Sequence, residues 1–392
     1  MLNTILYLLI LIIIILLAFL LKDKNTLITI IFSLLIIQII MAPKICIEGV
    51  ISGATLFFYK VFPSLFSFLI VCNVIIAYDG VYIYSKVIGN MICKPLRLPV
   101  SCSFVVIISV LCGYPLGTKY ACDLYENKTI NLQTCERLIN IASNGSPLFI
   151  LGSVGVSMLK DDFIGYILLL SNILSCIIMS FLIFPKQKLP KNTYIQSRHT
   201  MSQNNIGDVL KSSIENSIKT CLSIGGFVTL FSVINNIIKN NSLFSIILNN
   251  ISYITKIPLD VLQGSILGII EMTNGCNLIS GTSLPILPKI AIISFLFTFS
   301  GLSIISQVYS FTYKFDISMK TYTLRKLLQG LICSILSIFL YKTFYCNLFV
   351  ISSFNSLHNY NHYNTQNFIF LVYILFLIPW ILTKLKSLFH IP

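Results

Sequence analysis

The sequence predicts an all-α, polytopic membrane protein from three features: its scarcity of charge, its long apolar runs and the placement of its basic residues. Of its 392 residues, 56% are hydrophobic and only 10% are charged, whereas a soluble domain carries about 25% charged residues. So few charges cannot cover the surface of a soluble protein of this length, and lipid is the alternative surface. The net charge of +14 falls in short loops, where basic residues set topology and meet lipid headgroups. No basic stripe with interleaved aromatic residues indicates a nucleic-acid partner.

Eleven apolar segments approach the length of about 20 residues that a membrane-spanning helix needs. They are 2–21, 26–43, 54–78, 100–120, 134–159, 163–184, 213–239, 258–280, 286–312, 326–345 and 367–388. The first segment lacks the basic start and the cleavage pattern of a signal peptide, so we expect a transmembrane helix there. Two shorter stretches, 80–94 and 242–255, are predicted to be interfacial helices or the closing turns of a neighbour.

The basic loops limit how many of these segments cross the membrane. The loop 185–210 carries four basic residues before its first acidic residue, Asp208, and is therefore predicted to be cytoplasmic. The stretch 346–366 has neither Lys nor Arg and is expected on the opposite side. If all eleven segments crossed, the basic loops 79–99 and 313–325 would lie outside, against the positive-inside rule.

Two re-entrant hairpins, at 134–159 and 286–312, remove this conflict because they bring both basic loops inside. Turn-forming residues interrupt each segment: Asn144-Gly145-Ser146-Pro147 in the first and Ser300-Gly301-Leu302-Ser303 in the second. The legs on each side have about 10 residues, or about 15 Å of helix, which is roughly half a bilayer. The sequence therefore predicts about nine membrane-spanning helices plus two re-entrant hairpins.

An internal repeat relates residues 48–159 to residues 215–312 at an offset of about 160 residues. Each copy runs from an acidic residue through an early break, a mixed stretch, an apolar segment with a polar break and a hairpin. The early breaks are Val61-Phe62-Pro63-Ser64-Leu65-Phe66 and Ile224-Gly225-Gly226-Phe227. An odd number of crossings separates the copies, which predicts inverted repeats with discontinuous helices, as in many secondary transporters. The alternative is that two hydrophobic halves look alike by composition.

The repeat divides the chain into five parts. They are N-terminal transmembrane helices (1–45), a first gate-like repeat with its following helix (46–184), a basic cytoplasmic loop (185–210), a second gate-like repeat with its following helix (211–345), and a polar loop with a C-terminal transmembrane helix (346–392).

Glu271 is the sharpest candidate for a functional residue, because a carboxylate inside an apolar segment is costly unless it is paired, protonated or hydrated. Thr273 and Asn274 follow directly, and unwound backbone with hydroxyl and amide side chains can hold a cation or a polar ligand. The structural alternatives are that Glu271 caps a half-helix and that Thr273, Asn274 and Gly275 only end a helix.

Further candidates surround the other breaks. Freed carbonyls at Gly113, Tyr114 and Pro115, together with Lys119, could face an anionic ligand, unless Lys119 extends to the membrane interface. Helix N-termini at hairpin tips attract carboxylates or phosphates, although small residues there could serve helix packing. The candidates at the tips are Asn144, Ser146, Ser300, Gly301, Ser303 and Gln307.

Other kinds of chemistry have little support in the sequence. The twelve cysteines include no C-x-x-C pair and mostly lie in apolar runs, which indicates neither a disulfide framework nor a zinc site. His358 and His362 have a helical spacing, but their Asn-rich surroundings show no helical period. We find no nucleophile–base pattern and no phosphate-binding loop. The sequence therefore predicts no enzyme and no cofactor, and it leaves the oligomeric state open.

The ordered set of motifs resembles the YlbJ-type sporulation integral membrane proteins over about residues 45–345. The resemblance rests on Val61-Phe62-Pro63-Ser64-Leu65-Phe66, Gly113-Tyr114-Pro115-Leu116-Gly117-Thr118-Lys119, Glu136-Arg137-Leu138, Asn144-Gly145-Ser146-Pro147-Leu148-Phe149, Gly225-Gly226-Phe227, Glu271-Met272-Thr273-Asn274-Gly275 and Ser300-Gly301-Leu302-Ser303-Ile304. That family carries paired gate, or nucleoside-recognition, repeats similar to those of concentrative nucleoside transporters. The tail 346–392 matches the family pattern poorly.

The resemblance implies a role in spore formation and transport of a small organic anion, with dipicolinate across the outer forespore membrane as the expected cargo. An anion would suit Lys119 and the hairpin-tip N-termini, while Glu271 could bind a coupling proton or cation or hold the two repeats in register. The alternatives are a carrier of nucleosides or other neutral solutes, and a membrane scaffold in spore assembly that transports nothing.

Overall fold

All regular structure in the described part of the chain is helical, as the long apolar runs predict. The computed structural model describes residues 24–183 and 205–345. The α-helices are α2 (Lys24–Met41), α3 (Pro43–Leu56), α4 (Phe62–Ala77), α5 (Gly80–Val87), α6 (Gly89–Cys93), α7 (Ser103–Cys112), α8 (Leu116–Glu126), α9 (Leu132–Ile141), α10 (Asp162–Leu182), α11 (Ile206–Lys239), α12 (Ser242–Thr255), α13 (Leu259–Ile270), α14 (Met272–Ser280), α15 (Ile286–Phe299), α16 (Gly301–Thr312) and α17 (Met319–Leu340). Three π-helical turns, η1 (Phe57–Val61), η3 (Leu148–Leu159) and η4 (Tyr341–Tyr345), and a 3₁₀ turn, η2 (Val100–Cys102), complete the set.

Four stretches of the described residues are long and apolar enough to cross a membrane: α10, α11, the α15–α16 pair, and α17 with its extension to Phe344. Two bent pairs, α2 with α3 and α4 with α5, raise the number to six if each pair is one span. These helices confirm the polytopic all-α membrane class. The predicted total of nine spans includes 2–21 and 367–388, which lie outside the described residues, as do His358, His362 and most of the loops 185–210 and 346–366.

The helices α13 and α14 form a hairpin that turns back at Glu271. Gly268 of α13 lies directly against Gly275 of α14, so that a Cβ atom added at Gly275 would come within 2.1 Å of the Gly268 Cα. Nearer the open end of the hairpin, Gly264 lies against the side chain of Ile279. These contacts are symmetric about the bond between Glu271 and Met272, so the two helices are antiparallel. Glycine allows the backbones to approach this closely.

The helices α7 and α8 form the equivalent hairpin in the first repeat. A Cβ atom added at Gly117 would lie 2.9 Å from the Ser109 Cβ, which places these residues opposite each other about Gly113. Gly113 has a left-handed φ of 77°, and the Tyr114–Pro115 peptide bond is cis. The backbone N–H of Tyr114 donates to the carbonyl of Asn144 at 2.7 Å. The tip of this hairpin therefore contacts the break after α9.

The two segments predicted to be hairpins have a different role. The structure joins α15 and α16 into one apolar stretch, Ile286–Thr312, that is not among the pairs bent by more than 40°. Ser300 and Gly301 adopt left-handed φ values of 73° and 70° there, so they interrupt the helix without reversing it. The segment 134–159 consists of α9, a non-helical break and η3.

The hairpin assignment is therefore corrected: 103–126 and 259–280 turn back, and 286–312 does not. A proline or glycine break shows that hydrogen bonding is interrupted, but the packing of the legs decides whether the chain reverses. One segment of each repeat still turns back, so the number of membrane crossings in each repeat is unchanged. The predicted sides of the basic loops therefore do not change, and they remain predictions.

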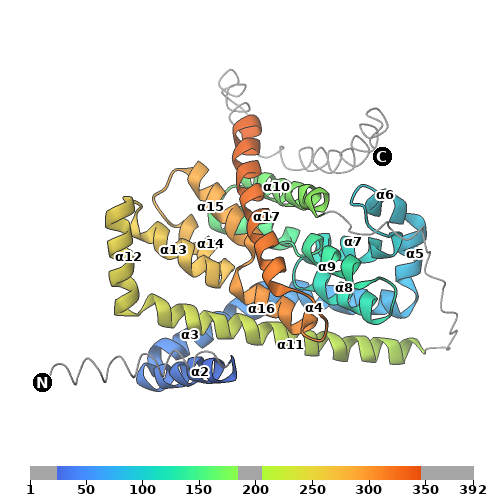
Figure 1. Cartoon of the computed structure of the whole chain (residues 1–392), viewed down its shortest axis with the longest axis horizontal. Coiled ribbons are helices and arrows are strands. Elements are labelled where there is room, and N and C mark those ends of the chain that lie inside the picture. The colour runs from blue at the N-terminus through green and yellow to red at the C-terminus, as the bar shows by residue number, and fades with distance from the viewer. Residues whose placement is uncertain (1–23, 184–204, 346–392) are drawn as a thin grey trace, which may run out of the picture.

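The order of elements repeats through the described chain. Each copy has a long helical stretch, one or two short helices, a hairpin, a broken helix and a second long helix, running from α3 to α10 and again from α11 to α17. The predicted early break at Ile224–Phe227 is wrong, because α11 continues through it (Figure 1). Gly225 there accommodates the ring of Phe57, so this glycine serves close helix packing and not a turn.

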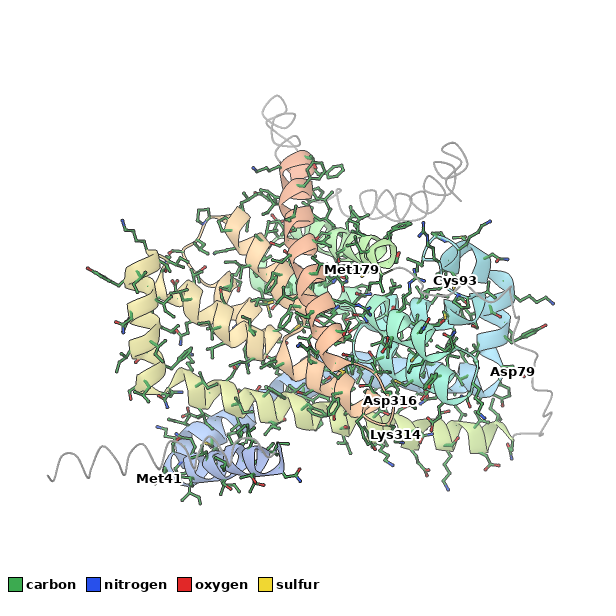
Figure 2. The ribbon with its side chains drawn as sticks, in the orientation of Figure 1. Met41, Asp79, Cys93, Met179, Lys314 and Asp316 are labelled. Carbon is green, nitrogen blue, oxygen red and sulfur yellow. The ribbon has the colours of Figure 1, made fainter. Side chains whose placement is uncertain are left out.

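The long helix α11 runs along one side of the molecule, against α3 and α4 of the first repeat and α13 and α16 of the second (Figure 1). Figure 2 shows Lys314 and Asp316 in the loop that connects α16 to α17, on the side where α11 lies. A buried apolar cluster from α4, α7, α8 and α9 also includes α11 and α16 residues. The two repeats therefore share one interior, and the site described next lies where they meet.

Candidate functional site

A cavity of about 250 Å³ lies between the two hairpin tips and the two broken helices. Eight of the predicted site residues contribute to its wall. They are Tyr114, Pro115, Ser146, Glu271, Thr273, Asn274, Ser303 and Gln307. Apolar side chains, among them those of α4, α11 and η3, line much of the remaining wall. An enclosed, mostly apolar space with a few converging polar groups is the usual form of a small-molecule site.

Four helix N-termini face this cavity, because each hairpin and each broken helix begins a new helical segment at its break. Wall residues come from the first turns of α8, η3, α14 and α16, or from the residues just before them. The N-terminus of a helix carries a partial positive charge and unpaired N–H groups. The segments α8 and α16 begin without a side-chain cap, so these two ends are the better placed to bind an acceptor group of a ligand.

Glu271 caps the second half of its own hairpin. Its two carboxylate oxygens accept hydrogen bonds from the backbone N–H groups of Thr273 at 3.1 Å and Asn274 at 2.8 Å. Only 3% of the residue is exposed, and the N-terminal end of α14 offsets its negative charge. This geometry supports the alternative that Glu271 caps a half-helix, although the residue also forms part of the cavity wall. One residue therefore closes the hairpin and borders the space.

Gln307 is a polar side chain in the wall with unused hydrogen-bonding capacity. Its Nε2 donates weakly to the Ser303 hydroxyl at 3.5 Å, while its Oε1 has no hydrogen-bond partner among the described residues. Only 1% of Gln307 is exposed. Because an unpaired buried polar atom costs about 1–3 kcal/mol, we expect a water molecule or a ligand to pair with it.

Tyr114 links the two hairpin tips across the wall. Its hydroxyl lies 2.8 Å from the sulfur of Met272 in the second hairpin and donates to the carbonyl of Phe297 at 3.2 Å. Tyr114 is the second residue of the first hairpin tip, so this contact ties one repeat to the other. The Tyr114 side chain therefore connects the two hairpin tips directly.

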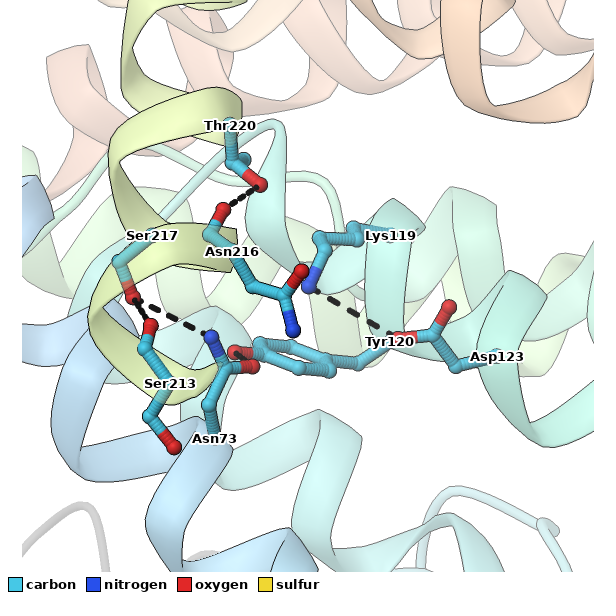
Figure 3. Close-up of polar contacts among 8 residues, drawn as sticks. All are labelled: Asn73, Lys119, Tyr120, Asp123, Ser213, Asn216, Ser217 and Thr220. Atoms are coloured by element: carbon cyan, nitrogen blue, oxygen red, sulfur yellow. Dashed lines mark hydrogen bonds and ion pairs between the residues drawn. The ribbon is translucent and has the colours of Figure 1, made fainter. Parts of the chain in front are cut away.

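Lys119 lies away from the cavity, contrary to the prediction that it faces the ligand. Its ammonium group forms an ion pair with Asp123 one turn later on α8, at 3.9 Å, and lies 4.5 Å from the centre of the Tyr120 ring. Figure 3 shows these groups beside Asn73 of α4 and a polar face of α11. Tyr120 donates to Asn73, which in turn donates to Ser217. The cluster joins three helices and leaves the cavity without a basic side chain among its described wall residues.

The remaining predicted residues support the wall from behind. Gly113 packs against the backbone of Ser146 and Asn144. Asn144 is buried between α9 and α10, where its oxygen accepts from Cys176 at 2.7 Å. Gly301 packs against the carbonyls at the end of α13, and Ser300 donates to the carbonyl of Phe299. These residues shape the breaks but do not line the cavity.

Several wall residues were not predicted. Ser153 and Ser157 of η3 and Asn277 of α14 all face the cavity. The spacing of Ser153 and Ser157, and that of Asn274 and Asn277, places each pair on one helix face, which is the signal that could have identified them. Among the described residues, no group of three or more His, Cys, Asp or Glu could hold a metal ion.

Comparison with known proteins finds a sequence similarity along most of the chain. No family model matches the chain. The sequence is 26% identical over 345 residues to the sporulation integral membrane protein YlbJ of Bacillus subtilis (strain 168), covering 83% of this chain and 84% of the relative. A solved structure of CNTnw in an inward-facing substrate-bound state aligns with a TM-score of 0.46 and 12% identity, covering 72% of this chain and 76% of that chain. The sequence match along most of both chains confirms that this protein resembles the YlbJ-type sporulation integral membrane proteins.

Proposed function

We propose that the cavity is the solute site of a membrane transporter or facilitator that acts in sporulation. The observation that carries this proposal is the convergence of two hairpin tips and two broken helices on one mostly apolar cavity with a few polar groups in its wall. Discontinuous helices of this kind place solute and ion sites at the centre of secondary transporters. The printed name of the B. subtilis relative supports the link to sporulation.

The expected cargo is a small organic anion, with dipicolinate across the outer forespore membrane as the first solute to test. The N-termini of α8 and α16, which lack side-chain caps, favour carboxylates. Two groups of the wall oppose this choice: the carboxylate of Glu271, and the Gln307 oxygen, which needs a donor. A neutral solute with both donors and acceptors, such as a nucleoside, is therefore the second candidate.

Flux through purified protein distinguishes the candidates. The protein would be reconstituted in liposomes and supplied in turn with labelled dipicolinate and labelled nucleosides. We expect saturable uptake of dipicolinate that unlabelled dipicolinate inhibits. Saturable uptake of nucleosides alone would replace the anion with the neutral solute. If neither class moves and the Glu271→Gln strain forms normal spores, the transporter proposal fails and a scaffold role, sensitive to changes in the loop 185–210, takes its place.

Replacing Gln307 by alanine is expected to weaken uptake of the transported solute by about 10-fold, measured as KM in liposomes. Loss of one hydrogen bond to a buried polar partner is worth about 1–2 kcal/mol, and 1.4 kcal/mol corresponds to a factor of ten. Gln133→Ala is the matched control, because Gln133 is exposed on α9. An unchanged KM in Gln307→Ala would exclude this side chain from the solute site.

Replacing Lys119 by alanine is expected to change the KM of the same uptake less than about 2-fold, because its ammonium group contacts Asp123 and not the cavity. Loss of a partly exposed ion pair costs about 0–1 kcal/mol of stability. A 10-fold loss of affinity in this variant would place Lys119 on the path of the solute.

A further inference from the structure

A buried lysine lies at the break of the first broken helix. Lys326 of α17 has 0% of its surface exposed. Its ammonium group donates to the backbone carbonyl of Ser143 and, at 2.9 Å, to the side-chain oxygen of Gln329. No carboxylate of the described residues lies within 4.0 Å of it. A buried charge without an opposite charge is costly, so the oxygen atoms around Lys326 must compensate it.

The Ser143 oxygen lies just beyond the C-terminal end of α9, whereas the Gln329 oxygen belongs to α17 itself. Three carbonyls at the break have a defined partner: the Asn144 side chain donates to Ile141, Lys326 donates to Ser143, and the Tyr114 N–H donates to Asn144. Lys326 is the charged member of this set. The C-terminal end of a helix carries a partial negative charge, so it attracts a cation.

One face of α17 contacts this break. Tyr322, Lys326 and Gln329 lie on successive turns of the helix, and all three contact the chain at residues 143–144. The Tyr322 hydroxyl lies 2.7 Å from the Ser143 hydroxyl, and the Gln329 amide donates to the Asn144 side chain at 3.3 Å. In α10, the counterpart of α17 in the first repeat, the charged residue is the N-terminal Asp162. The helix α10 therefore has no counterpart of Lys326.

This arrangement occupies the kind of place where transporters bind a mobile cation. Freed backbone carbonyls and the C-terminal ends of half-helices coordinate Na⁺ or protons in discontinuous helices. Here the ammonium group of α17 already supplies a positive charge at such a position, with carbonyl and amide oxygens as its partners. The same break holds Tyr114 of the cavity wall through the Asn144 carbonyl. Lys326 therefore contacts Ser143, and the next residue in the chain, Asn144, contacts Tyr114 of the cavity wall.

We propose that Lys326 is a built-in cation that takes the place of a mobile coupling ion at the end of α9. The protein then needs no Na⁺ or K⁺ to hold the break in its folded form, and solute binding at the cavity is independent of these ions. The claim that transport is independent of these ions rests on the proposed function. The claim that the Lys326 ammonium group occupies the cation position at the end of α9 does not. Removal of the ammonium group leaves oxygens arranged for a cation, and a monovalent metal ion becomes the ligand.

Thermal unfolding of the purified full-length protein in detergent tests the occupancy without any transport assay. The wild-type Tm is expected to be the same in 150 mM solutions (about physiological ionic strength) of Na⁺, K⁺ and choline chloride. The variant Lys326→Met is expected to melt at a lower temperature in choline and to gain roughly 2–4 °C in a saturable manner when Na⁺ or K⁺ is added. Lys320→Met, an exposed lysine of the same helix, is the matched control and should show no ion response.

Two further results decide the proposal even if Lys326→Met fails to fold. A wild-type Tm that rises with Na⁺ or K⁺, relative to choline, overturns it, because the position would then accept a mobile ion. The variant Lys326→Arg keeps the positive charge and should remain independent of these ions; an ion response in this variant also overturns the proposal.

Flux separates this inference from the proposed function. Ion-independent wild-type uptake of a solute supports both. Absence of any flux, together with the expected pattern of Tm values, rejects the transport function and leaves the built-in cation standing. Wild-type uptake that requires Na⁺ or K⁺ rejects the built-in cation and leaves transport standing.

Discussion

Replacing Gly275 by valine is expected to prevent the second hairpin from closing and to lower strongly the yield of folded protein. A Cβ atom at this position would lie 2.1 Å from the Cα of Gly268 and 2.8 Å from its nitrogen. Backbone cannot move aside as the end of a side chain can, so the two helices must separate. Overpacking of an interior costs about 1–3 kcal/mol, and displacement of a whole hairpin is expected to reach or exceed the upper end of that range.

The measurement is the yield of monodisperse protein after detergent extraction, followed by its Tm. Gly226→Val is the matched control, because a Cβ atom at Gly226 has no neighbour within 4 Å. The control should extract and melt like the wild type. If Gly275→Val also behaves like the wild type, the close antiparallel contact of α13 with α14, and with it the hairpin, would be wrong.

Replacing Arg137 by alanine is expected to have a comparable effect on the other repeat. Its guanidinium group donates to four backbone carbonyls: those of Ile183 and Ser180 in the last turn of α10 and just beyond it, and those of Leu96 and Arg97 before α7. Only 4% of Arg137 is exposed. A buried acceptor without a donor costs about 1–3 kcal/mol, so the loss of four partners is expected to destabilise the protein by at least about 3 kcal/mol.

The variant Arg137→Lys is the informative comparison, because it keeps the charge but replaces five fixed donors with three on a flexible stem. We expect its Tm to fall between those of the wild type and Arg137→Ala. Arg325→Met, on the more exposed side of α17, should lower the Tm little. Equal Tm values for wild type and Arg137→Ala would mean that the four carbonyls find other partners and that Arg137 does not hold these segments together.

The sequence alone located most of the breaks and eight of the residues that line the cavity. Glu271, Asn274 and Gln307 were identified because polar residues in apolar segments are costly, and this cost does not depend on how the helices pack. The internal repeat was visible for a similar reason, since each copy needs the same order of polar interruptions. The predicted position of Lys119 beside the cavity was wrong because a charge at the edge of an apolar segment has several possible partners, and Asp123, Tyr120 and Asn73 lie there only in the folded chain.

Lys326 and Arg137 show a second limit of the sequence. Lys326 stands at the start of an apolar segment and reads as a loop residue, yet 0% of it is exposed. One of its partners is the backbone carbonyl of Ser143 in the other repeat. The pattern of side chains in the sequence does not predict such a contact. Arg137 likewise binds four carbonyls of two segments. Backbone acceptors carry no sequence signal, so residues that bind them are recognised only from tertiary structure.

What the sequence by itself determined is the class of the protein, an all-α membrane protein with two copies of a broken apolar unit, because hydrophobicity and the loss of helix hydrogen bonds at Gly and Pro are local properties. What only the tertiary structure decided is which break turns the chain back. Glu271 ends a helix that reverses, whereas Ser300 and Gly301 interrupt one that continues. The difference arises from the contact of Gly268 with Gly275: close packing of two legs, and not the break between them, makes a hairpin.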